Sequence, residues 1–122
     1  MKCVLIGAGS RGMLYAKWAC GHGVEIVAVA ELRPDRLRYA GEVLRVPQER
    51  LFETAEALFA CGKLADTAIV ASLDRAHFGH VMQAMECGYD VLLEKPISPS
   101  AWECMEVERR ALGLGRKVTV CH

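Results

Sequence analysis

The stretch Val4-Leu5-Ile6-Gly7-Ala8-Gly9-Ser10-Arg11-Gly12, near the start of the chain, decides the fold class. Its three consecutive branched apolar residues are typical of a buried parallel strand. The glycines then follow at G-x-G-x-x-G spacing, and a helical pattern continues over residues 10–20. A strand that enters a helix through this glycine spacing is typical of folds that bind dinucleotides.

Each glycine of this loop has its own physical role in that prediction. Gly7 allows a tight turn, Gly9 lets a pyrophosphate approach the backbone, and Gly12 lets the helix pack closely on the strand. The N–H groups of Ser10 and Arg11 lie at the positive end of the helix and can bind an anion, near which Arg11 adds a charge. These five residues therefore form the predicted pyrophosphate site. A glycine-rich turn without a ligand is the alternative.

The rest of the chain alternates strand-like apolar runs with helical patterns. We expect strands over residues 25–30, 67–71, 90–93 and 117–121, with residues 46–52 irregular or a short strand at most. Helices separate them. Pro34 fits the first position of one, Thr54 and Ser100 fit N-caps, and Gly21 and Gly88 fit left-handed helix ends. Strands that alternate with helices predict a parallel sheet, and right-handed crossovers favour a doubly wound one. We therefore expect a single Rossmann-type α/β domain over residues 1–122.

Composition excludes several classes of protein. The hydrophobic fraction is 52%, and 15 basic residues balance 15 acidic ones, so the formal net charge is zero. These values exclude a disordered chain and argue against nucleic acid or a membrane as a partner. No apolar run approaches the roughly 18–20 residues of a membrane span. The six cysteines are scattered without a C-x-x-C pair, which predicts reduced thiols in a cytoplasmic protein.

Glu31 ends the second expected strand, about 20 residues after the glycine loop. A carboxylate there accepts hydrogen bonds from the ribose hydroxyls of adenosine and repels a 2′-phosphate, so NAD is favoured over NADP. Arg33 and Arg36 would favour NADP if Glu31 turned away. A solvated surface role is the simpler interpretation of both arginines, and an exposed acid is the alternative for Glu31.

Two further segments follow strands of the expected sheet. Ser72-Leu73-Asp74-Arg75-Ala76-His77 comes after the strand at 67–71, where open α/β sheets bind ligands, and Asp74 fits an N-cap. His77 and His80 lie three residues apart, but no third ligand is placed to complete a metal site, and we expect His80 at the surface. Glu94-Lys95-Pro96 ends another strand, and the proline fixes the backbone beside Lys95. A surface ion pair is the alternative there.

These three segments, with the stretch from Ala84 to Pro96, resemble the glucose–fructose oxidoreductase/inositol dehydrogenase (Gfo/Idh/MocA) family over essentially the whole chain. The resemblance implies a Rossmann domain that binds NAD or NADP, and hydride transfer at a sugar or cyclitol hydroxyl. Carried over by position, it also implies residue roles. Ser72, Leu73 and His77 would line the middle of the cofactor, and Glu94 and Lys95 would flank the nicotinamide ribose. Lys95 would be catalytic, stabilising the alkoxide. Many members have Asn at the position of Asp74, so a cofactor contact from Asp74 is not carried over.

The resemblance places the family's catalytic Asp and His in a second, C-terminal α/β domain, which would follow His122. We therefore expect the 122-residue chain to bind cofactor without turnover, and the full-length protein to form a homo-oligomer acting on a sugar-like small molecule. Three alternatives stay open: an NAD-dependent glycosidase of the same architecture, a ligand-sensing regulator without activity, and a methyltransferase.

Overall fold

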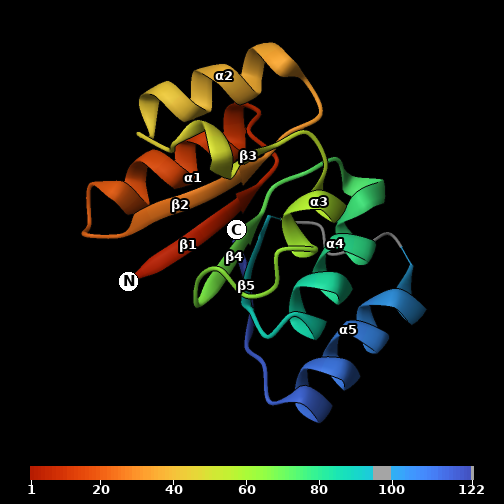
Figure 1. The fold of residues 1–122 in the computed structure, drawn as a ribbon. Helices are drawn as coiled ribbons and strands as arrows, with labels where there is room; N and C mark the ends of the chain where they lie inside the picture. The colour runs from red at the N-terminus through yellow and green to blue at the C-terminus, as the bar shows by residue number, and fades with distance from the viewer. Residues whose placement is uncertain (95–99, 122) are drawn as a thin grey trace.

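A six-stranded parallel sheet forms the centre of the molecule in the computed structural model, which describes residues 1–94 and 100–121. The strand order is β3-β2-β1-β4-β5-β6, and each neighbouring pair runs parallel (Figure 1). This order confirms the doubly wound α/β fold, because the chain crosses outward first in one direction from β1 and then in the other. The strands are β1 (Lys2–Ile6), β2 (Glu25–Ala30), β3 (Leu51–Phe52), β4 (Thr67–Val70), β5 (Asp90–Glu94) and β6 (Val118–Cys121).

Five helices cover the two faces of the sheet in separate groups (Figure 1). One apolar cluster joins β1 and β2 to the first two helices through residues such as Leu5, Met13 and Leu37. A second cluster joins the opposite face to the other three helices through residues such as Leu58 and Met85. The sheet is therefore buried on both sides, as a continuous apolar strand pattern requires. The helices are α1 (Ser10–Cys20), α2 (Pro34–Val43), α3 (Ala55–Phe59), α4 (Asp74–Glu86) and α5 (Ala101–Leu114).

Most of the expected helix ends are confirmed. The hydroxyl of Thr54 accepts a hydrogen bond from the Ala57 N–H at 3.1 Å, and Ser100 caps α5 in the same way. Gly88 has φ +95° just after α4, as a left-handed helix end requires.

The prediction for Gly21 is wrong. Gly21 has φ −67°, and Gly23, with φ +85°, takes the left-handed conformation two residues later. The N-cap prediction for Asp74 is also wrong, since α4 begins at Asp74 and Leu73 is its N-cap. Residues 46–52 contain a single 3₁₀ turn, Gln48–Arg50, and the two-residue strand β3, as expected of a segment with little apolar pattern.

The fold gathers the polar motifs at one edge of the sheet. β1 and β4 are hydrogen-bonded neighbours, yet the helix after β1 lies on one face and the helix after β4 on the other. Such a switch opens a crevice outside the carboxyl ends of the strands. In the part of the chain that the structure describes, no helix has both the length and the apolar character that spanning a membrane demands.

Candidate functional site

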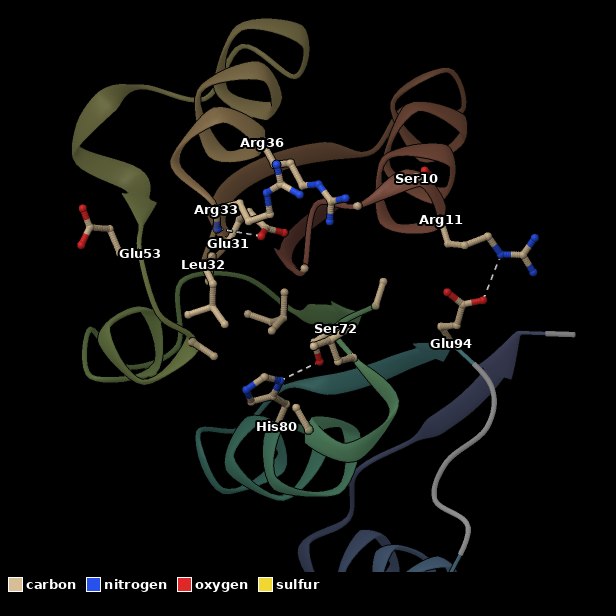
Figure 2. A pocket seen from close by; sticks show the side chains of 18 of the residues that line it. Ser10, Arg11, Glu31, Leu32, Arg33, Arg36, Glu53, Ser72, His80 and Glu94 are labelled. Atoms are coloured by element: carbon tan, nitrogen blue, oxygen red, sulfur yellow. Dashed lines mark hydrogen bonds and ion pairs between the residues drawn. The ribbon is translucent and has the colours of Figure 1, made fainter.

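A cavity of about 530 Å³ opens at this switch point. Its walls come from the loops that follow β1, β2 and β4, from the start of α3, and from the end of β5 (Figure 2). The structure thus brings together segments that the sequence separates by more than 80 residues. Among the residues predicted from the sequence, those that line the cavity are Gly7, Gly9, Ser10, Arg11, Glu31, Ser72, Leu73 and Glu94.

The glycine loop is shaped by close backbone contacts. Gly7 has φ +93°, and a Cβ there would lie 2.7 Å from the Ala71 carbonyl group. A Cβ on Gly12 would lie 2.1 Å from the Gly7 carbonyl oxygen, far inside van der Waals contact. Gly12 does not line the cavity. Its lack of a side chain lets α1 begin directly against the turn. Gly9 does line the cavity, and the nearest atom to a Cβ there would be Arg36 Nη1, at 3.4 Å.

The N-terminus of α1 presents hydrogen-bond donors to this cavity. Gly9 is the N-cap and has no side chain with which to cap the helix. The first N–H groups of a helix have no partner within the helix, and here Ser10 and Arg11 line the cavity. An anion that enters the cavity would meet these donors together with the positive end of the helix dipole.

The Glu31 carboxylate is held against the loop by two backbone donors. Its Oε1 accepts a hydrogen bond from the Ala8 N–H at 2.7 Å, and its Oε2 accepts one from the Arg33 N–H at 2.9 Å. A carboxylate offers about four lone-pair positions, so each oxygen can still accept a hydroxyl group. Glu31 therefore faces the cavity in a fixed orientation (Figure 2).

The two arginines of this region differ in their surroundings. Arg33 forms an exposed ion pair with Asp35, with 3.2 Å between Nη2 and Oδ2. The Arg36 guanidinium lies over Gly9 and lines the cavity, and no ion pair joins it to another residue within 1–94 or 100–121. Arg36 is therefore the cation placed to contact a phosphate group at the glycine loop.

An ion pair spans the cavity at the opposite end from Glu31. Arg11 Nε donates to Glu94 Oε1 at 3.0 Å, linking the first turn of α1 to the end of β5 (Figure 2). The Arg11 side chain is 56% exposed and that of Glu94 only 14%, so the pair lies at the cavity rim. This contact raises the pKa of Arg11 further, because the hydrogen bond favours the charged guanidinium. Lys95, the predicted catalytic residue, lies outside the described residues.

The two histidines of α4 occupy different positions from those expected. His77 is fully buried, and its Nε2 lies 2.6 Å from the Ser72 carbonyl oxygen, so it supports the loop from below and does not line the cavity. The prediction of His80 at the surface is wrong. His80 is half-buried, lines the cavity, and its Nδ1 lies 2.7 Å from Ser72 Oγ (Figure 2). Helical spacing shows that His77 and His80 share one side of α4, but only the tertiary fold brings the latter to Ser72.

Burial favours the neutral imidazole of His80. Burial lowers the pKa of His80 below its ordinary value of 6.5, and the nearby His77 lowers the pKa further. Glu56 acts in the opposite direction, with its Oε2 4.0 Å from His80 Nε2. Glu56 belongs to the set of cavity residues that sequence reasoning missed, which also includes Leu32, Ala55 and Ala76. No cluster of three or more metal-ligating side chains occurs among the described residues.

The donors, acceptors and apolar walls fit a dinucleotide. Gly9 has no Cβ, so a pyrophosphate can approach the backbone of the loop. The first turn of α1 offers N–H donors to that pyrophosphate. Glu31 offers acceptors for ribose hydroxyls. The lining also includes apolar side chains, those of Leu32, Ala55 and Ala76, which suit a purine ring.

Comparison with known families agrees with this interpretation. Residues 1–122 match the model of an oxidoreductase family with an NAD-binding Rossmann fold. D-apiose dehydrogenase of Paraburkholderia graminis is 34% identical over 99 residues, which cover 80% of this chain and 25% of that protein. Inositol 2-dehydrogenase of Klebsiella pneumoniae is 27% identical over 120 residues, which cover 97% of this chain and 35% of that protein. The chain therefore spans a quarter to about a third of the length of these relatives.

A solved structure shows the same fold. The crystal structure of the WlbA dehydrogenase from Bordetella pertussis, in complex with NADH and UDP-GlcNAcA, superposes with a TM-score of 0.90. The match covers 99% of this chain and 37% of that one, at 20% sequence identity. At that identity the likeness bears on the fold alone.

Proposed function

This chain belongs to the Gfo/Idh/MocA oxidoreductase family, and we propose that it forms the NAD-binding domain of a dehydrogenase that acts on a sugar or cyclitol hydroxyl. The observation that carries this proposal is the fixed arrangement of the glycine loop, the first turn of α1 and the Glu31 carboxylate around one cavity. The family is NAD-binding, and the names of the relatives, D-apiose and inositol dehydrogenases, support the substrate class.

Different residues of the cavity would bind different parts of the dinucleotide. The N–H groups of Ser10 and Arg11 would hold the pyrophosphate, with the Arg36 guanidinium beside Gly9 as a second cationic contact. The Glu31 carboxylate would accept the hydroxyls of the adenosine ribose. A 2′-phosphate in that place would face the Glu31 charge, so we propose NAD as the preferred cofactor over NADP.

Ser72 and Leu73 also line the cavity, and we propose that they contact the middle of the cofactor. His77 would act from behind this wall, because its hydrogen bond to the Ser72 carbonyl oxygen fixes the loop. Glu94 ends β5 at the cavity rim, and we propose that it contacts the nicotinamide ribose.

When bound, the nicotinamide would accept the hydride of the substrate. Lys95 follows Glu94 directly in the sequence, and we propose that its ammonium group stabilises the alkoxide of the substrate hydroxyl. The hydroxyl proton would pass to the catalytic Asp and His pair that the resemblance places in a second domain. A sugar or cyclitol supplies a secondary hydroxyl for this chemistry. The position directly after a strand whose last residue lines the cavity supports this role.

We further propose that the full-length protein forms a homo-oligomer and works in the cytoplasm. Free thiols at Cys3, Cys20, Cys61 and Cys87 support a reducing compartment. Substrate turnover by the 122-residue chain alone is not expected.

Calorimetric titration of the chain with NADH and with NADPH tests the cofactor proposal directly. We expect NADH to bind at least about tenfold more tightly than NADPH. The Glu31 carboxylate would repel the 2′-phosphate of NADPH by more than about 1.4 kcal/mol, even at an effective dielectric constant of about 20. Glu31→Gln keeps the side-chain length and an acceptor for Ala8 N–H but removes the charge. In this variant the preference for NADH should shrink several-fold.

Glu42→Gln is the matched control. Glu42 lies on the exposed side of α2 and does not line the cavity, so this variant loses the same charge but should retain the NADH preference. Tighter binding of NADPH by the unaltered chain would overturn the cofactor assignment and transfer the role to Arg33 and Arg36. Binding of neither dinucleotide would contradict the proposed function of this domain.

A further inference from the structure

We propose that Glu56 and His80 recognise the base of the bound dinucleotide and select adenine over hypoxanthine. This inference rests on the proposed function, because it concerns the far end of the same cavity. Both side chains line the cavity, but they come from different elements, α3 and α4, whose residues lie 24 positions apart in the chain. Neither residue is needed for the pyrophosphate or ribose contacts described above.

The geometry of the cavity places the base beside these two residues. A pyrophosphate at the first turn of α1 and a ribose at Glu31 fix the direction of the dinucleotide. The base would then continue past Glu31, beside Leu32, Ala55 and Ala76, which also line the cavity. Glu53, Glu56 and His80 are polar side chains that also line the cavity. The Glu53 carboxylate points away from His80 (Figure 2), whereas Glu56 Oε2 lies 4.0 Å from His80 Nε2.

The environment of His80 determines which ring nitrogen carries the proton. Its Nε2 faces the Glu56 carboxylate at 4.0 Å, and its Nδ1 lies 2.7 Å from Ser72 Oγ. The negative charge of Glu56 favours the proton on Nε2, so we assign Nδ1 as the acceptor of the Ser72 hydroxyl. His77, on the same helix, is the other titratable group acting on His80, and it disfavours a second proton. His80 therefore presents an N–H donor beside a carboxylate acceptor.

Within residues 1–94 and 100–121, the gap between these two groups leaves both of them able to bind a ligand. A separation of 4.0 Å between Nε2 and Oε2 exceeds hydrogen-bonding distance, so neither group satisfies the other. A planar ligand that carries an acceptor beside a donor on one edge could accept a hydrogen bond from His80 and donate one to Glu56 at the same time. Adenine has such an edge, with the N7 acceptor beside the N6 amino donor.

Hypoxanthine has the opposite pattern at one of these two positions. It keeps N7 but carries a carbonyl oxygen in place of the amino group. That oxygen would face the Glu56 carboxylate, bringing two acceptors together. Discrimination of this kind arises from the repulsive contact as much as from the lost hydrogen bond. Because Glu56 is 65% exposed, we expect about tenfold selectivity, toward the lower end of what one good bidentate contact provides.

The test compares NAD⁺ with nicotinamide hypoxanthine dinucleotide by calorimetric titration of the whole chain. We expect NAD⁺ to bind about tenfold more tightly. Glu56→Gln should reduce this ratio to less than about threefold, because a glutamine amide can both donate and accept. His80→Leu should weaken both dinucleotides while leaving the ratio nearly unchanged, because N7 is common to the two bases. Both substitutions alter side chains on the cavity wall and leave the glycine loop intact.

Glu49→Gln is the matched control, since Glu49 is exposed, lies near α3 in the chain and does not line the cavity. It should retain the full preference for NAD⁺. Equal affinity of the unaltered chain for the two dinucleotides would overturn this inference but leave the proposed function standing. Retention of the tenfold ratio in Glu56→Gln would overturn it as well. If neither dinucleotide bound, both the proposed function and this inference would fail.

Discussion

Replacing Gly12 by alanine tests the contact on which the glycine loop is built. The added Cβ would lie 2.1 Å from the Gly7 carbonyl oxygen and 3.2 Å from the Ala71 Cβ. Relief requires a shift of roughly 1 Å, and Gly7 cannot yield easily because its N–H is bonded to the Ala30 carbonyl at 2.8 Å. Forced overpacking of this kind costs about 1–3 kcal/mol. Alanine also favours a helix by about 0.5–1 kcal/mol, which offsets part of that cost.

We therefore expect Gly12→Ala to lower the free energy of unfolding by about 1–2 kcal/mol, which corresponds to roughly 3–10 °C in Tm for a domain of this size. NADH binding should weaken strongly, because the first turn of α1 moves with Gly12. Differential scanning calorimetry and titration calorimetry give the two values.

Gly79→Ala and Gly113→Ala are the matched controls, since a Cβ at these helical positions would meet nothing within 4 Å. Both should raise Tm by a few degrees through helix propensity alone. A Gly12→Ala variant that unfolds at or above the temperature of the unaltered chain would refute the steric argument.

Three further predictions concern other contacts. Glu94→Gln releases Arg11 from its ion pair while keeping an acceptor oxygen. Titration calorimetry should then show that NADH binds about two- to fivefold more tightly, because an exposed ion pair contributes only a small free energy. Weaker binding of NADH would contradict this prediction. Burial lowers the pKa of His80, so the imidazole binds a proton more readily in the unfolded chain than in the folded one. The contribution of His80 to stability should therefore be complete above about pH 6.5 and should decline as the pH falls below that value. In His80→Gln, the loss of Tm between pH 7.5 and 5.5 should be smaller than in the unaltered chain; an identical loss would exclude His80 as a cause. Tyr89→Phe removes a buried hydroxyl that accepts a hydrogen bond from the Leu64 N–H at 2.9 Å and donates one to the Gly62 carbonyl. Urea unfolding should show that the free energy of unfolding falls by about 1–3 kcal/mol with an unchanged m-value. An unchanged free energy of unfolding would mean that water replaces both hydrogen bonds.

The parts of the fold that depend on local chemistry could be predicted from the sequence. The glycine spacing after Val4-Leu5-Ile6 predicts the β1–α1 turn, and the hydroxyls of Thr54 and Ser100 predict where α3 and α5 begin. These signals are local because a cap or a turn is satisfied by residues only a few positions away. The predicted sheet follows from the alternation of strands and helices, which leaves few topologies open.

The parts of the site that depend on distant contacts could not be predicted. Glu56 and His80 approach each other only because α3 and α4 pack on the same face of the sheet. The burial of His77 likewise follows from the carbonyl of Ser72, which lies five residues before it and across the start of a helix. Gly21 fits a left-handed helix end by its position, but Gly23 two residues later offers the same freedom, and the sequence does not distinguish them.

The hydrogen bonds beneath the glycine loop separate two kinds of amide. The Gly7, Ala8 and Ala71 N–H groups are bonded to the Ala30 carbonyl, the Glu31 carboxylate and the Ile6 carbonyl respectively, so the ends of three strands are joined into one frame. Amides bound in this way exchange with deuterated solvent only when the frame opens. The first-turn amides of α1 have no such protection and should exchange within seconds, until an anion occupies them. Exchange rates across these neighbouring residues would therefore record occupancy of the loop separately from its stability, in a single experiment on the chain itself.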